Sequence, residues 1–167
     1  MIENRKPIIG VMGPGNPKDS EILKHAEKIG MQIANRNWVL LTGGRKAGVM
    51  DAASKGASEA GGEVIGILPG DSDRDISDYV SIPIVTGVGS ARNYINILSS
   101  DVVIVCGMGL GTSSEAALAM KHGKPTLFTK VGKSKLDFFQ SLTNKKILFF
   151  DEADALFEFI EKNLIKD

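Results

Sequence analysis

Short apolar runs rich in β-branched residues alternate along this chain with segments of helical periodicity, almost from end to end. Such alternation is typical of a parallel sheet whose crossover helices cover both faces. The predicted strands are Pro7–Met12, Trp38–Leu41, Val64–Leu68, Ile82–Val85, Asp101–Cys106, Pro125–Thr129 and Lys145–Phe150; the predicted helices are Ser20–Arg36, Ala47–Ala60, Ser90–Ser99, Thr112–His122 and a last helix with Leu156, Ile160 and Leu164 on one face. The pattern predicts an α/β fold, a Rossmann-like three-layer sandwich with a mostly parallel sheet.

Length and charge limit the domain count and the class of partner. A chain of 167 residues fits a single domain, 1–167, that is long enough to bury a core. Its 20 basic and 20 acidic residues cancel and no Lys/Arg block stands out, so neither a nucleic acid nor a membrane surface is expected as a partner. The N-terminus is charged and lacks a signal-like apolar region, and no apolar run approaches the ~20 residues that span a bilayer. These features predict a cytoplasmic protein that recognises a small ligand.

A glycine-rich segment joins the strand Asp101–Cys106 to the helix that follows it. Its sequence is Gly107-Met108-Gly109-Leu110-Gly111-Thr112-Ser113-Ser114-Glu115. Glycines allow the backbone to approach a ligand closely, and the free amides and dipole of a helix N-terminus attract negative charge. The segment therefore predicts a phosphate site, although similar turns also join strands to helices where no ligand binds. The candidate binding residues are Gly107, Gly109, Gly111, Thr112 and Ser113.

Other glycine-containing loops follow the first three predicted strands. The carboxyl ends of parallel strands share one edge of the sheet, and ligands bind at that edge where the crossovers diverge. The convergence of these loops predicts a pocket for a nucleotide-like or otherwise phosphorylated ligand. Its further candidate residues are Gly13 and Gly15 after the first strand, and Gly43, Gly44, Arg45 and Gly48 after the second.

Several common phosphate-binding and metal-binding motifs are absent. A classical dinucleotide site needs an acidic residue near the end of the second strand, which here ends in Thr42-Gly43. The segment Gly132-Lys133-Ser134 would fit the end of a Walker loop, but that motif needs a glycine five residues before Gly132, and this position is Leu127. The acidic segment 71–75 begins like a calcium loop, but Ile76 takes the place of the required glycine. No metal site is therefore predicted.

The remaining polar and aromatic candidates are expected to have structural roles. His25 and His122 are far apart in sequence, without supporting metal ligands, and are predicted to lie on a helix surface or at a helix end. Cys106 ends an apolar strand and is predicted to be a buried small hydrophobic residue rather than a nucleophile. Trp38 and the pair Phe149-Phe150 are core candidates.

Two charged residues are candidates for chemistry. Arg92 lies near the start of the helix that leads to the strand before the glycine-rich segment, and Glu115 lies in the first turn of the helix after that segment. An arginine can bind phosphate or carboxylate in a forked geometry, and a carboxylate can bind ribose hydroxyls or stabilise an oxocarbenium-like centre. Both residues could equally serve the helix termini or remain solvated, because spacing alone does not define a mechanism. A catalytic role and a pure binding role remain open.

Three parts of the chain resemble the LONELY GUY (LOG) superfamily, whose members were formerly labelled lysine decarboxylases. The resemblance extends from the first strand to about Thr129. The matches to the Gly-Gly-Gly-x-x-Gly-Leu-Met hallmark are Gly43, Gly44, Gly48 and Met50, and the matches to the Pro-Gly-Gly-x-Gly-Thr-x-x-Glu hallmark are Gly109, Gly111, Thr112 and Glu115, with Arg92 ahead of the second hallmark.

The LOG enzymes cleave nucleoside 5′-monophosphates to a free base and ribose 5-phosphate, so the resemblance implies catalytic roles for Arg92 and Glu115. The chain departs from the enzyme pattern: Arg45 replaces the third glycine, Gly107-Met108 replaces Pro-Gly, and Asn93 follows Arg92 where the enzymes have Lys. With these departures the chain is more similar to the molybdenum cofactor carrier branch. That resemblance implies a homo-oligomer, dimer or tetramer, that binds a pterin phosphate without turnover.

Three functions therefore remain open. The first is a binding protein or carrier that requires no cofactor and whose cargo is the molybdenum cofactor or an AMP-like nucleotide. The second is a LOG-type phosphoribohydrolase, and the third is a regulatory nucleotide sensor. In the first two, Gly109, Gly111, Thr112 and Ser113 cradle the phosphate, while Gly43, Gly44 and Arg45 close the other side of the pocket. No lysine motif supports pyridoxal-phosphate-dependent decarboxylation.

Overall fold

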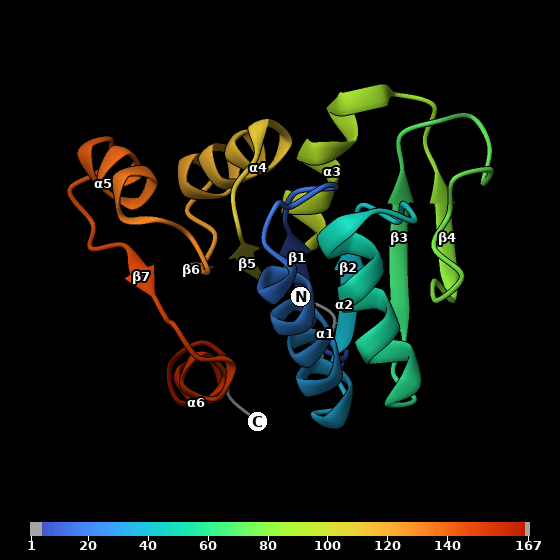
Figure 1. Cartoon of the computed structure of the whole chain (residues 1–167), viewed down its shortest axis with the longest axis horizontal. Helices are drawn as coiled ribbons and strands as arrows, with labels where there is room; N and C mark the ends of the chain where they lie inside the picture. Colours follow the sequence, from blue (N-terminus) through green and yellow to red (C-terminus); the bar gives the residue numbers. More distant parts are fainter. Residues whose placement is uncertain (1–4, 166–167) are drawn as a thin grey trace.

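Seven parallel strands form a single sheet in the computed structural model, which describes residues 5–165. Their order is β4-β3-β2-β1-β5-β6-β7, and each neighbouring pair is parallel. The strands are β1 (Ile8–Met12), β2 (Val39–Thr42), β3 (Val64–Leu68), β4 (Ile82–Val85), β5 (Val102–Cys106), β6 (Thr126–Thr129) and β7 (Leu148–Phe149). The chain winds outward from β1 to β4 and then crosses back to β5, so the strand order reverses between β1 and β5 (Figure 1). The predicted α/β fold is confirmed.

Helices cover both faces of the sheet (Figure 1). They are α1 (Ser20–Asn35), α2 (Gly48–Glu59), α3 (Arg92–Ser99), α4 (Leu110–Lys121), α5 (Lys133–Ser141) and α6 (Ala153–Asn163). The first, second and sixth helices share one core cluster with alternate strand residues, and α3, α4 and α5 share the other. Within β5, Val102 and Ile104 face one cluster while Val103 and Val105 face the other, as the period-two geometry of a strand requires.

Helix α5 is missing from the sequence prediction. Of its nine residues only Phe139 is buried, and the neighbouring Phe138 is 59% exposed. A helix that buries so few side chains leaves no apolar stripe of helical period for sequence analysis to detect.

Helices α1 and α2 pack with their backbones in direct contact, and two glycines make this possible. A Cβ atom added at Gly30 would lie 1.9 Å from the carbonyl oxygen of Ala53, and one added at Gly56 would lie 1.9 Å from that of Glu27. Any larger residue at either position would force the helices apart. This packing sets α2, and the loop that precedes it, close to the carboxyl end of β1.

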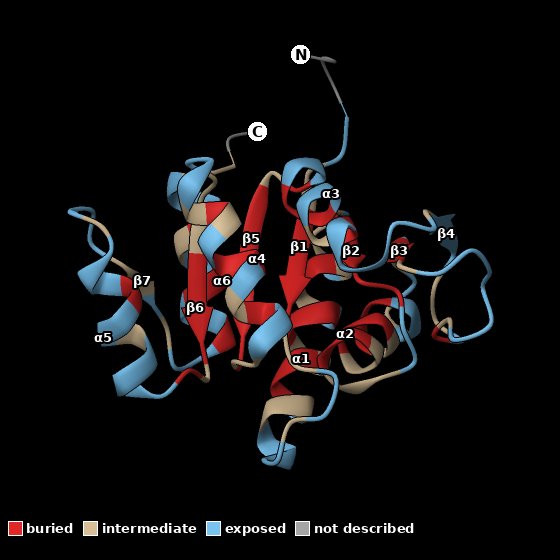
Figure 2. Ribbon diagram, turned by 90° about the horizontal axis from the view of Figure 1, so that it is seen from above, coloured by how far each residue is buried: buried red, intermediate tan, exposed pale blue. Residues whose placement is uncertain are grey.

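The inner strands are buried and the edges of the sheet are exposed (Figure 2). The prediction that Phe149 is a core residue is therefore wrong, because Phe149 lies in the two-residue edge strand β7 and is 37% exposed. Trp38 is partly buried and packs against Phe157. Cys106 is fully buried, as predicted, and burial raises the pKa of its thiol to about 12.

The prediction for His25 is wrong and that for His122 is confirmed. His25 is buried, and its Nε2 lies 2.8 Å from Thr129 Oγ1. Burial, aided by the charge of Lys130, lowers the pKa of His25. His122 is the C-cap residue of α4. The periodicity of α1 places His25 toward the sheet, but only the position of β6 supplies its partner.

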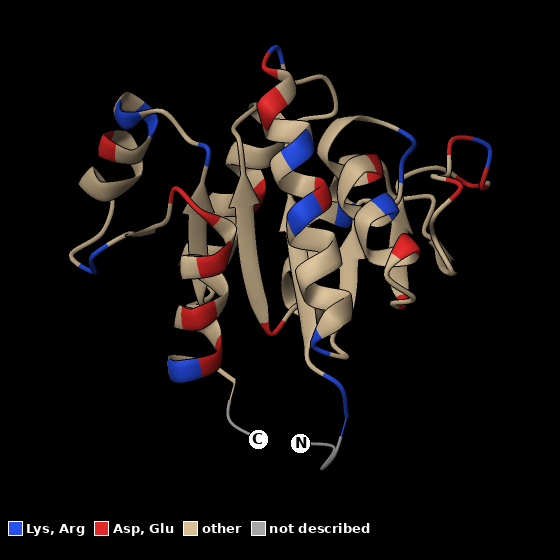
Figure 3. Ribbon diagram, turned by 60° about the horizontal axis from the view of Figure 1, so that its bottom comes forward, with Lys and Arg blue, Asp and Glu red and all other residues tan. Residues whose placement is uncertain are grey.

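Acidic and basic residues are intermingled along the helices and loops (Figure 3). Ion pairs connect neighbouring helices, for example Lys28 Nζ to Asp154 Oδ2 at 2.9 Å between α1 and α6. Among residues 5–165, no helix has the length and apolar character needed to cross a membrane. The same residues contain no group of three His, Cys, Asp or Glu side chains placed to hold a metal ion.

Candidate functional site

A cavity of about 240 Å³ opens at the carboxyl edge of the sheet, where β1 and β5 lie side by side and their connections diverge. This is the place at which doubly wound sheets bind ligands. The cavity is lined by Val11, Met12, Gly13, Pro14, Gly15, Gly43, Arg45, Met50, Arg92, Asn93, Gly109, Leu110, Gly111, Thr112 and Glu115. A second cavity of about 250 Å³ opens at the amino end of β6, but none of the charged side chains that line it is buried.

The structure brings most of the predicted site residues to the first cavity. The predicted residues that line it are Gly13, Gly15, Gly43, Arg45, Arg92, Gly109, Gly111, Thr112 and Glu115. Four others, Gly44, Gly48, Gly107 and Ser113, lie next to the cavity but do not line it. Loops that are far apart in sequence therefore meet at one rim, while their roles in ligand binding remain predictions.

The glycines outside the cavity shape its loops. Gly44, Gly48 and Gly107 all have positive φ (73°, 50° and 74°), which disfavours other residues. A Cβ at Gly48 would also lie 2.3 Å from the carbonyl oxygen of Pro14, so this glycine allows α2 to begin against the loop after β1. The hydroxyl of Ser113 donates a hydrogen bond to the backbone carbonyl of Gly109, one turn earlier in the chain, at 2.9 Å.

The N-terminus of α4 presents free backbone donors to the cavity. Its N-cap residue is Gly109, which has no side chain to accept hydrogen bonds from the first-turn amides. The first amides of a helix have no partner within the helix, and together with the helix dipole they favour an anion. Gly111 lies in this turn, lines the cavity and is exposed, so a ligand can reach the backbone there.

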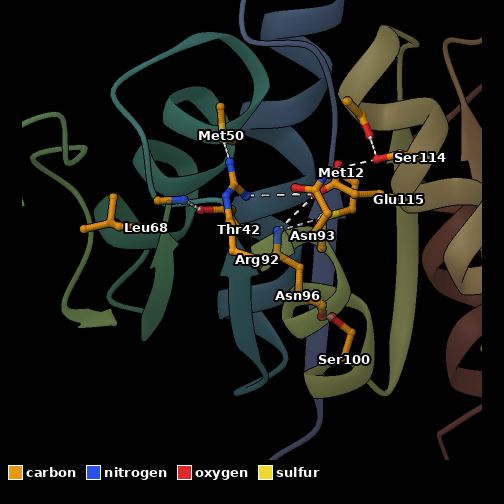
Figure 4. A network of polar contacts seen from close by, with 12 residues as sticks. Met12, Thr42, Met50, Leu68, Arg92, Asn93, Asn96, Ser100, Ser114 and Glu115 are labelled. Carbon is orange, nitrogen blue, oxygen red and sulfur yellow. Dashed lines mark hydrogen bonds and ion pairs between the residues drawn. The ribbon is translucent and has the colours of Figure 1, made fainter. Parts of the chain in front are cut away.

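Arg92 is the first residue of α3 and is only 9% exposed. Its guanidinium lies against the backbone of Gly43, where a Cβ would be 2.1 Å from Nη1. Within residues 5–165 it donates no hydrogen bond to oxygen: Nη2 lies 3.9 Å from the sulfur of Met50, and Nε has no partner (Figure 4). Burial lowers the pKa of Arg92; the charge of Glu115 opposes this shift and that of Arg45 adds to it. The cavity thus contains a buried cation with unused donors.

Glu115 lies beside this cation and is 6% exposed. Its Oε1 accepts a hydrogen bond from Asn96 Nδ2 at 3.0 Å and lies 4.0 Å from Arg92 Nη1, a distance too long for a hydrogen bond. Burial raises the pKa of Glu115, and the Asn96 hydrogen bond and the charge of Arg92 act in the opposite direction. The side chains of Arg92 and Glu115 are close neighbours, but no hydrogen bond joins them.

Asn96 is the main site residue that the sequence analysis missed. It is fully buried, and Figure 4 shows it pointing with Arg92 from α3 toward Glu115. Asn96 follows Arg92 by four residues, and residues with this spacing share one face of a helix. That spacing is the signal that could have identified it. Met12, which lines the cavity beside these polar groups, was missed as well, and Met50, which also lines it, was identified only as a match to the LOG hallmark.

Asn93 connects the two helices that carry the charged pair. Its Nδ2 donates to Ser114 Oγ at 2.9 Å, joining the start of α3 to the first turns of α4. Asn93 also lines the cavity, at the position where the LOG pattern has Lys. An uncharged side chain at this position leaves Arg92 and Arg45 as the basic residues of the cavity lining.

Comparisons with known proteins agree with this architecture. The sequence profile of the SLOG cluster4 family matches residues 6–157. The molybdenum cofactor binding protein of the phototrophic bacterium Rippkaea orientalis is 50% identical, with a TM-score of 0.91 over 95% of this chain and 97% of that one. The molybdenum cofactor carrier protein of Chlamydomonas reinhardtii is 48% identical, with a TM-score of 0.89 over 95% and 98%.

A more distant relative is an enzyme. The cytokinin riboside 5′-monophosphate phosphoribohydrolase of Mycobacterium tuberculosis is 32% identical over 117 residues, which are 69% of this chain and 63% of that protein.

Proposed function

Because this chain belongs to the SLOG cluster4 family, we propose that it binds a phosphorylated pterin or nucleotide-like ligand without turnover, with the molybdenum cofactor as its first candidate cargo. The observation that carries this proposal is the likeness, over 95% of the chain, to two proteins named for binding or carrying that cofactor. The cavity at the carboxyl edge of the sheet supports it, since it combines free helix amides with a buried guanidinium.

In this proposal the phosphate of the ligand lies at the N-terminus of α4. The first-turn amides around Gly111 and Thr112 donate to it, and Thr112 can add its hydroxyl. Gly13 and Gly15 bring the loop after β1 against the same group, and Arg45 supplies positive charge from the opposite wall. Gly44, Gly48, Gly107 and Ser113 act indirectly, by holding these loops in place.

The alternative is hydrolysis of a nucleoside 5′-monophosphate, and the mycobacterial relative together with the Arg92–Glu115 pair favours it. In that reaction an ionised Glu115 would stabilise the charge that develops at the anomeric carbon. The likeness to this enzyme is weaker, with 32% identity over 69% of the chain, than the likeness to the two cofactor-binding proteins, with 50% and 48% identity over 95% of the chain. We therefore place binding without turnover first.

We also propose that the protein is a homo-oligomer, a dimer or a tetramer. Tyr94, Ile95 and Leu98 of α3 are exposed apolar or aromatic residues on the helix that carries Arg92 into the cavity. Exposed apolar groups of this kind mark protein interfaces. Light scattering of the wild type and of Leu98→Asp tests this: dissociation in the variant supports the proposal, and a monomeric wild type contradicts it. A cytoplasmic location remains a prediction.

The decisive experiment incubates the purified chain with molybdopterin and, separately, with nucleoside monophosphates, and follows bound ligand and released products by chromatography. Retention of molybdopterin without product supports a carrier. Release of free base and ribose 5-phosphate, lost in Glu115→Gln, would identify a hydrolase instead. Nucleotide binding that only changes the oligomeric state would identify a sensor.

A further inference from the structure

We propose that Arg92 and Glu115 together recognise the amino-oxo edge that pterins share with guanine, in which a carbonyl oxygen is followed by a ring N–H and an exocyclic amino group. The cavity would then select ligands that carry this edge over adenine nucleotides. The inference rests on the proposed function, because it concerns the ring of the ligand whose phosphate lies at α4.

Arg92 supplies the donor half of this recognition. A buried guanidinium that donates to no oxygen within the described residues is costly unless another group accepts its hydrogen bonds. The side chain is held by its contacts with Gly43 and Met50, so its donors are fixed toward the cavity that it lines. A ligand carbonyl oxygen would satisfy them.

Glu115 supplies the acceptor half. One oxygen already accepts from Asn96, which fixes the carboxyl group, and the other has no hydrogen-bond partner among residues 5–165. A carboxylate can accept two parallel hydrogen bonds from two adjacent N–H groups. The ring N–H and amino group of pterin or guanine form such a pair, whereas adenine presents one amino donor next to a ring nitrogen that only accepts.

The separation of the two side chains fits a shared ligand edge. Arg92 Nη1 and Glu115 Oε1 are 4.0 Å apart, so no direct hydrogen bond uses up the donors of one or the acceptors of the other. Side by side, they present donors next to acceptors. The amino-oxo edge has the complementary order, an acceptor next to two donors.

Two methionines form an apolar wall beside the pair, against which a flat ring can pack. Met12 and Met50 line the cavity beside Arg92 and Glu115, with the Met12 sulfur 3.9 Å from Asn96 Nδ2 and the Met50 sulfur 3.9 Å from Arg92 Nη2. Thioethers pack well against aromatic rings and offer only weak acceptors to hydroxyl groups.

The test measures affinities of the full chain for GMP, IMP, AMP and 2′-deoxy-GMP by calorimetry. GMP and IMP share phosphate, ribose and carbonyl and differ only in the amino group. We expect GMP to bind about 10-fold or more tightly than IMP, since one charge-assisted hydrogen bond is lost. Removal of the 2′-hydroxyl should have little effect.

The near-isosteric variant Glu115→Gln should weaken the binding of GMP more than that of IMP, because GMP donates two hydrogen bonds to this side chain and IMP donates one. Thermal melting checks the folding of the variant. Glu59→Gln, at an exposed position on α2, is the control and should bind like the wild type. Molybdopterin should bind Glu115→Gln about 10-fold or more weakly.

Two outcomes would overturn the inference while leaving the proposed function intact. One is equal affinity for GMP, IMP and AMP, with or without a strong loss for 2′-deoxy-GMP. The other is that Glu115→Gln binds molybdopterin as tightly as the wild type does. This second measurement decides the question if the wild type binds no nucleotide. Failure of molybdopterin and every nucleotide to bind the wild type would instead refute the proposed function itself, and the inference with it.

Discussion

Gly43→Ala would test whether Arg92 must lie against the backbone of Gly43 for a ligand to bind. The new Cβ would be 2.1 Å from Arg92 Nη1, 2.7 Å from its Cζ and 2.6 Å from the Met50 sulfur. The φ angle of Gly43 is outside the positive region, so alanine itself is not strained there. The close atoms are the ends of two flexible side chains. We therefore expect Arg92 to move to another rotamer at a cost of about 1 kcal/mol in stability.

The loss in ligand affinity should be larger than the loss in stability. Moving the guanidinium removes charge-assisted hydrogen bonds to the ligand, worth about 1.5–3 kcal/mol, which corresponds to roughly 10- to 100-fold weaker binding. Calorimetry with molybdopterin measures the affinity, and thermal melting measures the stability. Gly70→Ala is a suitable control, because its Cβ would meet nothing closer than 3.8 Å.

A double-mutant cycle separates this mechanism from a general disturbance of the loop. If Gly43→Ala acts through Arg92, it should add almost nothing in the Arg92→Ala background, and the two effects should be strongly non-additive. Additive losses, or wild-type affinity in Gly43→Ala, would refute the argument that Gly43 makes room for the guanidinium.

Three further predictions concern stability. Because burial raises the pKa of Glu115, the folded chain binds the carboxyl proton more tightly than the unfolded chain does. The protonated carboxyl group should therefore stabilise the fold fully below pH 4.5, and this stabilisation should be lost as the pH rises through the pKa of the folded state; urea unfolding of the wild type and of Glu115→Gln across this range measures it. Asp101→Ala should lower the free energy of unfolding by about 1–3 kcal/mol, because the carboxylate accepts a hydrogen bond from the backbone N–H of Ile8 at 2.8 Å; unchanged urea unfolding would contradict this. Gly30→Ala should cost about 1–3 kcal/mol by forcing α1 from α2; a melting temperature equal to that of the wild type would contradict this.

Sequence patterns predicted the fold class and the edge of the sheet where the candidate site lies. The alternation of short apolar runs with helical periods reflects local geometry, namely the two-residue repeat of a strand and the 3.6-residue repeat of a helix. Once a parallel sheet is predicted, the loops after its strands must converge, because their carboxyl ends share one edge. Gly13, Gly43 and Gly109 could therefore be assigned to one rim before any coordinates were known.

The tertiary structure alone decided how the polar groups at that rim meet. The start of α3 at the carboxyl edge lays Arg92 on Gly43, and the packing of α3 against α4 brings Asn96 within 3.0 Å of Glu115. The tertiary structure also shows that Gly48 does not line the cavity but allows close contact with the backbone of Pro14. Such contacts join segments far apart in sequence, and they depend on how closely helices and sheet pack. Local periodicity reports which face of an element is buried, but not which atoms of another element it meets.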